Sequence, residues 1–299
     1  MSNRTRLQSG VVEKFRSRPY RLSACTAYPW RSAGLTAQRD LLWENISELP
    51  YFRGLLRAVE GRFYQDLPLE APTLDLGCGD GQFAEITFPR QLELGVDPWL
   101  APLREAIQRQ AYQVIAQSYG QRIPAPDNTF ASAISNSVLE HIPDVQPVLD
   151  DLARVLKPGG IFYFCVPNHN FDPNLSVARF FNRIGLKGLA RAYRCWFDHI
   201  ARHAHLDDPA TWQARVEAAG LRVVRHWNYF SPQALAILEW GHYWGLPAWI
   251  AKLLFRRWIV APTPWNFALT RMIVNPAWTE PQPQPDGVCT FFICQKPLP

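Results

Sequence analysis

Acidic residues around a glycine-rich run carry the clearest chemical signal in the sequence. The run Leu74-Asp75-Leu76-Gly77-Cys78-Gly79-Asp80-Gly81 begins as a short apolar strand, and Asp97 ends the next apolar run, twenty residues after Gly77. Glycines let a backbone come close to a ligand. A carboxylate at the end of the second parallel strand can accept both hydroxyls of a ribose. We therefore expect a nucleoside-containing ligand at the carboxyl edge of a parallel sheet.

The same turn differs from the one that binds dinucleotides. That turn requires G-x-G-x-x-G, whose third glycine packs near a pyrophosphate, and Gln82 occupies this place here. The carboxylate of Asp75 would repel a pyrophosphate, whereas it attracts a ligand that carries an ammonium and a sulfonium. The turn therefore favours a cationic cofactor.

Further motifs follow the turn in order along the chain. They are Gly95-Val96-Asp97, Ile123-Pro124-Ala125-Pro126-Asp127-Asn128-Thr129-Phe130, Ser135-Asn136-Ser137-Val138-Leu139-Glu140-His141-Ile142, Leu156-Lys157-Pro158-Gly159-Gly160 and Glu217-Ala218-Ala219-Gly220-Leu221. With the glycine turn, they make residues 70 to 230 resemble the class I S-adenosylmethionine-dependent methyltransferases. The resemblance is to the small-molecule branch called the type 11 methyltransferase domain.

The resemblance implies an α/β fold, a Rossmann-like doubly wound sheet of seven strands with the last strand antiparallel. It implies S-adenosyl-L-methionine as cofactor, with S-adenosyl-L-homocysteine as product. The cofactor-binding residues that follow are Asp75, Gly77 and Gly79 for the methionine part, Asp97 for the ribose, Tyr119 and Gly120 for the adenine, and the backbone near Asn136 for the amino group. Cys78 and Pro98 are expected to bind the cofactor beside them.

Two positions depart from the family pattern, which commonly has Asp where Tyr119 and Ala131 stand. The first usually faces the adenine amino group. Tyr119 is able to stack on adenine or to donate its hydroxyl, and the amide of Gly120 still reaches the ring edge. We expect the change at Ala131 to affect packing alone.

Histidines are the candidate catalytic residues. His141 follows Glu140 just after the fourth predicted strand, where it is placed either to act as a base or to support the cofactor side. His203 and His205 are candidates to face the substrate. His199 and His203 have the i, i+4 spacing of zinc ligands on one helix face, but no third ligand stands at a diagnostic distance, so we expect no metal.

The strands and helices that must position these residues are predicted from short apolar runs that alternate with helical patterns. The predicted strands cover residues 73–76, 92–96, 113–116, 130–135, 161–166, 221–227 and 289–294. Predicted helices begin near Gln82, pass through Leu103 and Ile107, and cover 145–156 and 210–219. The sixty residues between the last two strands are too many for a structureless connection, so we expect a helical insertion that forms a lid.

Composition and charge exclude several classes of protein. The chain has 299 residues, 47% of them hydrophobic, which is ordinary for a globular protein. Six cysteines without a C-x-x-C pair favour a reduced, cytoplasmic setting. Residues 1–31 carry a net charge of +6, whereas the whole chain carries +5. The basic excess therefore lies in an N-terminal arm and not on the rest of the chain. We therefore expect no nucleic-acid partner.

The last quarter of the chain contains seven of the twelve tryptophans. Trp240, His242 and Trp244 are candidate substrate residues, and Glu239 stands among them as either a pocket or a surface residue. Residues 234–260 interleave aromatic and basic side chains, so this segment is either a lid or a peripheral membrane contact.

These patterns divide the chain into a basic arm and cap (1–45), a cofactor-binding core (46–230), a Trp-rich insertion (231–286) and a last core strand (287–299). The predicted activity is methyl transfer to a small apolar or aromatic acceptor such as a lipid, a quinone or a natural product. Two alternatives remain open. One is O-methylation of a sugar or polar metabolite, and the other is a non-catalytic binding or regulatory role.

Overall fold

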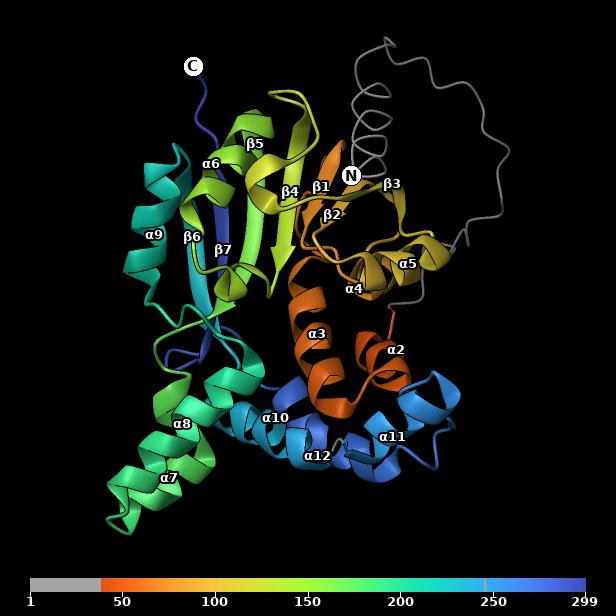
Figure 1. Ribbon diagram of the computed structural model, residues 1–299, viewed down its shortest axis with the longest axis vertical. Coiled ribbons are helices and arrows are strands. Elements are labelled where there is room, and N and C mark those ends of the chain that lie inside the picture. The colour runs from red at the N-terminus through yellow and green to blue at the C-terminus, as the bar shows by residue number, and fades with distance from the viewer. Residues whose placement is uncertain (1–38, 245) are drawn as a thin grey trace, which may run out of the picture.

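One sheet of seven strands organises the chain in the computed structural model, which describes residues 39–244 and 246–299. The strand order is β3-β2-β1-β4-β5-β7-β6, and β7 runs antiparallel to both its neighbours (Figure 1). This confirms the predicted Rossmann-like α/β fold. The strands are β1 (Thr73–Leu76), β2 (Leu92–Asp97), β3 (Tyr112–Gln117), β4 (Phe130–Asn136), β5 (Leu156–Pro167), β6 (Arg222–Tyr229) and β7 (Cys289–Gln295).

Helices cover both faces of the sheet because its strands alternate apolar side chains between two cores. Phe162 and Phe164 face a core shared with α6 (Gln146–Val155) and α9 (Pro209–Ala218). Tyr163 and Cys165 face the opposite core. That core also includes side chains of α2 (Leu41–Glu48), α3 (Tyr51–Phe63), α4 (Gln82–Thr87) and α5 (Leu100–Arg109).

Strand β5 begins earlier than the sequence pattern predicts. Helix α6 ends at Val155 as expected, but the strand already pairs at Leu156, opposite Phe130. The next pair is Ser132 with Ile161, so residues 157–160 form an irregularity within the strand instead of a separate turn. Gly159 takes φ +79° there, a conformation that glycine adopts without strain.

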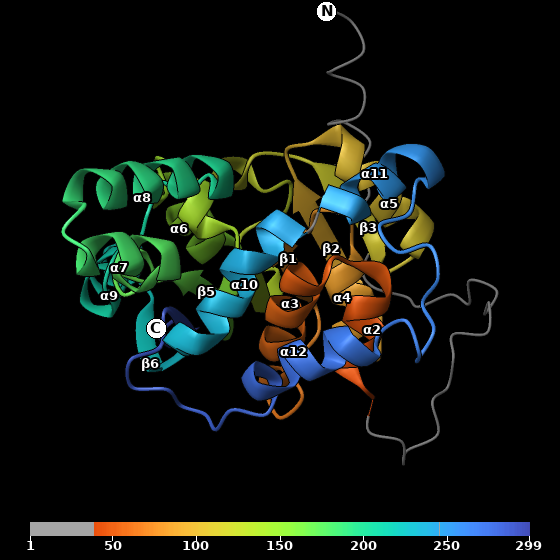
Figure 2. The same ribbon diagram turned by 90° about the horizontal axis from the view of Figure 1, so that it is seen from below.

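The remaining helices gather at the end of the molecule where the parallel strands finish (Figures 1 and 2). Between β5 and β6 lie α7 (Ser176–Arg183) and α8 (Lys187–Ala201), and between β6 and β7 lie α10 (Pro232–Trp244), α11 (Leu246–Phe255) and α12 (Ala268–Trp278). Helices α10 and α12 both pack on α3. Short 3-10 turns are η1 (Gly120–Arg122), η2 (Leu139–His141) and η3 (Asp172–Asn174).

The division of the chain predicted at residue 45 falls inside α2, and residues 1–38 of the basic arm lie outside the described part. Helix α2 starts at Leu41 with Asp40 as its cap, whose carboxylate accepts a hydrogen bond from the N–H of Trp43. Among the described residues, no helix has the length and apolar character needed to cross a membrane.

Candidate functional site

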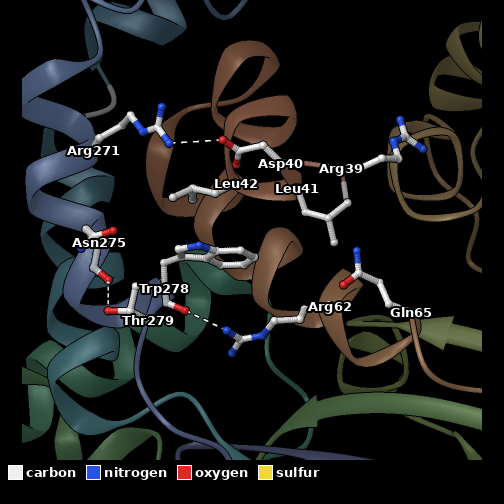
Figure 3. A pocket seen from close by; sticks show the side chains of 10 residues that line it. All are labelled: Arg39, Asp40, Leu41, Leu42, Arg62, Gln65, Arg271, Asn275, Trp278 and Thr279. Carbon is white, nitrogen blue, oxygen red and sulfur yellow. Dashed lines mark hydrogen bonds and ion pairs between the residues drawn. The ribbon is translucent and has the colours of Figure 1, made fainter. Parts of the chain in front are cut away.

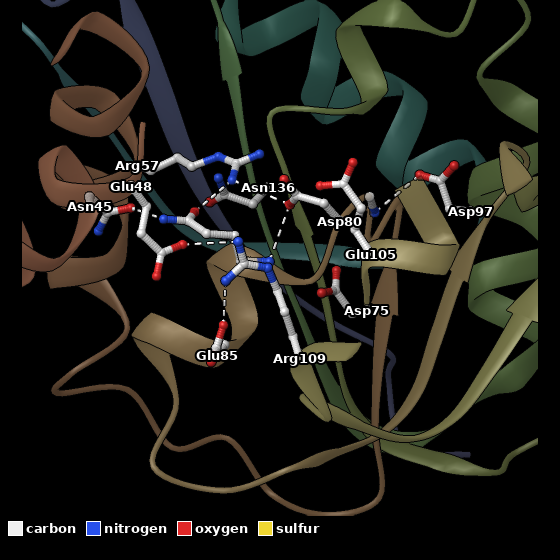
Figure 4. A network of polar contacts seen from close by, with 12 residues as sticks. Asn45, Glu48, Arg57, Asp75, Asp80, Glu85, Asp97, Glu105, Arg109 and Asn136 are labelled. Carbon is white, nitrogen blue, oxygen red and sulfur yellow. Dashed lines mark hydrogen bonds and ion pairs between the residues drawn. The ribbon is translucent and has the colours of Figure 1, made fainter. Parts of the chain in front are cut away.

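The glycine turn after β1 meets the end of β2 directly. Asp97 accepts hydrogen bonds from the N–H of Gly79 at 3.1 Å and of Trp99 at 2.8 Å, which fix its carboxylate (Figure 4). Gly79 has φ +53°, and a Cβ added there would meet no atom within 4 Å. The peptide at Gly79 is therefore open to a ligand on the side where a side chain would otherwise stand.

Asp75 lies buried behind this turn. The hydroxyl of Tyr112 donates to its carboxylate at 2.6 Å. Burial raises the pKa of Asp75 to about 7, and the nearby Asp97 adds to the rise, while the Tyr112 hydrogen bond and Arg57 oppose it. Near neutral pH the site thus holds a carboxyl group whose charge a cationic ligand would favour.

Helix α3 contributes two charged residues that sequence reasoning missed. The guanidinium of Arg57 donates to Gln82 at 2.6 Å and lies 3.6 Å from the carboxylate of Asp80, so it faces the glycine turn (Figure 4). Glu60 follows one helical turn later on the buried side of α3. No local sequence pattern distinguishes Arg57 and Glu60 from the other charged residues of this helix.

Glu60 joins α3 to the ends of two strands. Its carboxylate accepts hydrogen bonds from the Asn136 amide at 2.6 Å, the Ser137 hydroxyl at 2.9 Å and the Tyr229 hydroxyl at 2.7 Å. Burial raises its pKa, which these three donors oppose. The side chain of Asn136 is therefore occupied by Glu60, and the contact predicted for the cofactor amino group remains one for its backbone.

Gly77 must be glycine for a packing reason. It has φ +83°, and an added Cβ would lie 2.4 Å from the side chain of Val138 in the loop after β4. Cys78 is also buried, and its N–H donates a hydrogen bond to the carbonyl of Val96 at 3.0 Å. Both residues shape the turn, and their predicted contacts with the cofactor stay predictions.

The residues expected around the ribose and the adenine lie beyond β2 and β3. Pro98 follows β2 directly, and Tyr119 is 65% exposed, as is the neighbouring Trp99. Gly120 fits closely, since a Cβ there would lie 2.8 Å from Val148. The structure thus leaves the ring of Tyr119 accessible for the stacking predicted for it.

His141 lies at the same edge, one short turn after β4. Its Nδ1 is 3.0 Å from the carbonyl oxygen of Arg202, so Nδ1 carries the proton and Nε2 keeps a lone pair. Burial lowers the pKa of His141, which favours the neutral ring. Nε2 lies 3.7 Å from the carboxyl of Glu140, a buried group whose pKa is raised well above its ordinary value by burial. A neutral imidazole with a free lone pair is suited to accept a proton.

The other two candidate histidines play different parts. The ring of His203 stacks on that of His141 with centroids 6.0 Å apart. His205 instead lies between the carbonyls of Ile142 and Pro143, at 3.0 and 3.2 Å, and so fastens the chain after α8 to the loop after β4. The structure brings His141 and His203 together and gives His205 a structural contact.

The helical spacing expected for His199 and His203 is wrong. Helix α8 ends at Ala201, and Arg202 follows in the left-handed region at φ +59°. His203 therefore lies beyond the helix and turns toward His141, whereas His199 is exposed. Within the described residues, no group of three or more His, Cys, Asp or Glu side chains is arranged to hold a metal ion.

Aromatic rings continue from the two histidines into the helical end. Phe171 lies edge-on to His203 at 5.0 Å, and Phe197 lies 6.1 Å from Phe171. His242 follows, 5.2 Å from Phe197 and 4.2 Å from Phe52 of α3. We call this series the aromatic row; it consists of His141, His203, Phe171, Phe197, His242 and Phe52.

Comparisons with known proteins decide the family. Residues 44–226, more than half of the chain, match the family described as a methyltransferase domain. The chain is a class I methyltransferase. It is 27% identical over 201 residues to trans-aconitate 2-methyltransferase of Variovorax paradoxus, covering 62% of this chain and 73% of the relative. It is 32% identical over 107 residues to ubiquinone biosynthesis O-methyltransferase of Klebsiella pneumoniae, covering 32% of this chain and 43% of the relative.

A solved structure shares the fold of this methyltransferase. The [4+2]-cyclase SpnF superimposes with a TM-score of 0.51 at 14% identity, over 83% of this chain and 82% of that protein. Because that protein is named as a cyclase, the fold alone does not fix the reaction.

The candidate residues of the Trp-rich insertion differ in their burial and contacts. Glu239 is fully buried and accepts hydrogen bonds from the N–H of Ser176 at 2.6 Å and the hydroxyl of Tyr193 at 2.6 Å, so it caps α7 and holds α8. His242 belongs to the aromatic row, while Trp240 is 48% exposed and donates to the Ser176 hydroxyl. The side chain of Trp244 lies outside the described part.

Two cavities lie away from the glycine turn. One, of about 390 Å³, is lined by residues of α2, α3 and α12, including Arg62, Arg271 and Trp278 (Figure 3). The other, of about 490 Å³, lies at the opposite edge of the sheet beside Lys157 and Ala131. Ala131 thus stands far from the predicted cofactor site, in agreement with a packing role.

Proposed function

We propose that this methyltransferase transfers a methyl group from S-adenosylmethionine to a small apolar or aromatic acceptor beside the aromatic row. The observation that carries the proposal is the position of His141. It stands at the carboxyl edge where the aromatic row begins, and its Nε2 lies 3.7 Å from the Glu140 carboxyl without a hydrogen bond to any described residue. An acceptor held there would meet apolar rings on one side and a proton acceptor on the other.

The residues at the turn fit the cofactor. Asp97 is oriented by two backbone N–H groups and keeps lone pairs for ribose hydroxyls, and the peptide at Gly79 is open. Asp75 would favour the positive charges of the cofactor, and Arg57 is a cation suited to its carboxylate. When bound, S-adenosylmethionine supplies an electrophilic methyl group on a positively charged sulfur.

His141 acts on the acceptor in this proposal. If the acceptor is a hydroxyl, Nε2 takes its proton while the carbonyl of Arg202 keeps the ring in the required tautomer. Phe171 and Phe197 of the aromatic row are buried. An apolar or aromatic acceptor would therefore contact the partly buried members of the row, Phe52 and His242. The relatives are named for trans-aconitate and for ubiquinone biosynthesis, so their names support more than one acceptor class.

Transfer of labelled methyl from S-adenosylmethionine into an extract of the source organism tests the proposal. We expect label in the organic phase, and none with Asp97→Ala. Label confined to the aqueous phase would refute the apolar acceptor and favour O-methylation of a sugar or polar metabolite, which His141 could also serve as base. Cofactor binding without any transfer would favour the non-catalytic role.

A further inference from the structure

The helices beyond the carboxyl edge expose far more apolar surface than the rest of the molecule. The described residues include 24 large hydrophobic side chains that are exposed. Eighteen of them belong to two segments, residues 176–201 and 240–273, which form α7, α8 and the insertion. Phe180 is 57% exposed, Leu253 68% and Trp265 77%. Large apolar side chains exposed in this number on neighbouring helices indicate an interaction surface.

These helices lie together at one end of the molecule. Both views place α7 and α8 beside α10, with α11 and α12 continuing across the same end (Figures 1 and 2). We call this surface the helical end, defined by residues 176–201 and 232–278. It stands on the side of the sheet where the parallel strands finish.

The helical end is also strongly basic. Residues 176–201 contain five arginines or lysines and one acidic residue, Asp198. Residues 232–278 contain four basic residues and one acidic residue, Glu239, which is buried. The two segments therefore sum to +7, although residues 32–299 sum to −1, which leaves −8 on the remainder. The molecule is polarised, with its positive charge beside its exposed apolar side chains.

Several of these basic side chains are free to meet a partner. Arg183, Lys187 and Arg191 are exposed, and none forms an ion pair with a carboxylate of the described chain. Lys252 is different, because it lies 3.4 Å from Glu105 of α5. The hairpin of α7 and α8, and not only residues 234–260, therefore supplies the available positive charge.

We propose that the helical end docks on a bilayer surface that contains anionic phospholipid. Exposed tryptophan, leucine and phenylalanine side chains can enter the interface while arginines and lysines meet the negative headgroups. A second copy of the chain is disfavoured on this face, since two ends of charge +7 would repel each other. The proposal depends on surface features alone and not on which acceptor is methylated.

Flotation of the full-length protein with vesicles tests the docking. One set of vesicles is pure phosphatidylcholine, and the other contains phosphatidylglycerol at about one third. We expect flotation with the anionic vesicles that falls as salt is raised, and little with the neutral ones. No flotation with either set, or equal flotation with both, would overturn the proposal.

Matched variants locate the contact. Arg183→Gln, Lys187→Gln and Arg191→Gln together should weaken partitioning about 100-fold, since each basic group near such a surface contributes about five-fold. The control combines Lys157→Gln, Arg222→Gln and Arg225→Gln, exposed residues of β5 and β6 with the same change in charge. We expect the control to partition like the unmodified protein; equal losses in the two variants would contradict a local contact.

A third variant separates the helical end from the basic arm. Arg4→Gln, Arg6→Gln and Lys14→Gln together remove the same charge from the arm. If this variant loses binding while the hairpin variant keeps it, the arm is the membrane contact and the proposal is wrong. Cofactor binding, measured on every variant, confirms that each one is folded.

Discussion

Asp75→Asn should remove a specific part of the pH dependence of stability. The native pKa of Asp75 is about 7 against an ordinary value of 3.8, because the carboxylate is buried. Between these two values the folded protein holds a proton that the unfolded chain releases. Since the native pKa is raised, stability falls as pH rises through this window and levels off above pH 7.

The size of the effect follows from the two pKa values. The whole window corresponds to about 4 kcal/mol, and the part between pH 5 and pH 8 corresponds to about 3 kcal/mol. Asparagine keeps an oxygen for the Tyr112 hydroxyl and has no charge to bury. Between pH 5 and pH 8, the free energy of unfolding of the variant should therefore fall by about 3 kcal/mol less than that of the unmodified protein.

Urea unfolding of both proteins without cofactor, at pH 5 and pH 8, measures this difference. All other titrating groups are shared, so they cancel in the comparison. In the same variant we expect cofactor affinity at pH 8 to fall about 10- to 100-fold, because the negative charge proposed to favour the cationic cofactor is lost. Equal pH dependence of stability in the two proteins would refute the assignment of a buried, titrating carboxyl to Asp75.

Three further substitutions test other parts of the structure. His141→Ala should reduce turnover about 10²- to 10⁴-fold in a steady-state assay while cofactor affinity is kept, and unchanged turnover would remove its role as base. Gly77→Ala should cost about 2 to 5 kcal/mol in urea unfolding from its positive φ and the clash with Val138, and a cost that Val138→Ala does not reduce would disprove the clash. Glu239→Gln should cost about 1 to 3 kcal/mol and speed amide exchange in α7, whereas unchanged exchange would show that the cap is dispensable.

The sequence predicted the centre of the sheet well because β1, β4 and most of β5 are buried on both faces. Continuous apolar runs such as residues 161–166, bounded by glycine or proline, are unambiguous, and each predicted strand overlaps an observed one. The glycine turn and Asp97 were equally readable, since their spacing reflects one supersecondary unit. Those features depend on local order along the chain.

Contacts between distant segments could not be predicted in this way. Glu60 lies 76 residues from Asn136 and 169 residues from Tyr229, and no local pattern marks such a cluster. The end of α8 at Ala201 depends on the left-handed Arg202, a residue type without a strong preference for that conformation. His203 therefore lies beyond the end of the helix that its spacing from His199 predicted for it.

Surface character was only partly readable. The aromatic and basic pattern of residues 234–260 indicated either a lid or a membrane contact, but the pairing of Lys252 with Glu105 was not visible. The exposed hairpin of α7 and α8 was missed because its apolar residues look like those of any packed helix. An exposed helix differs from a packed helix here in the exposure of its apolar side chains and not in its composition.

Titration of the purified protein with S-adenosylmethionine at pH 8 tests the central claim most directly. Asp97→Ala removes the carboxylate that the N–H groups of Gly79 and Trp99 orient, and Asp66→Ala removes an exposed carboxylate without any described partner as the control. We predict saturable binding that Asp97→Ala weakens at least about 30-fold, in line with the loss of two hydrogen bonds to a charged group, and that the control leaves unchanged. Equal affinity of the unmodified protein and Asp97→Ala would contradict the cofactor site described for this methyltransferase.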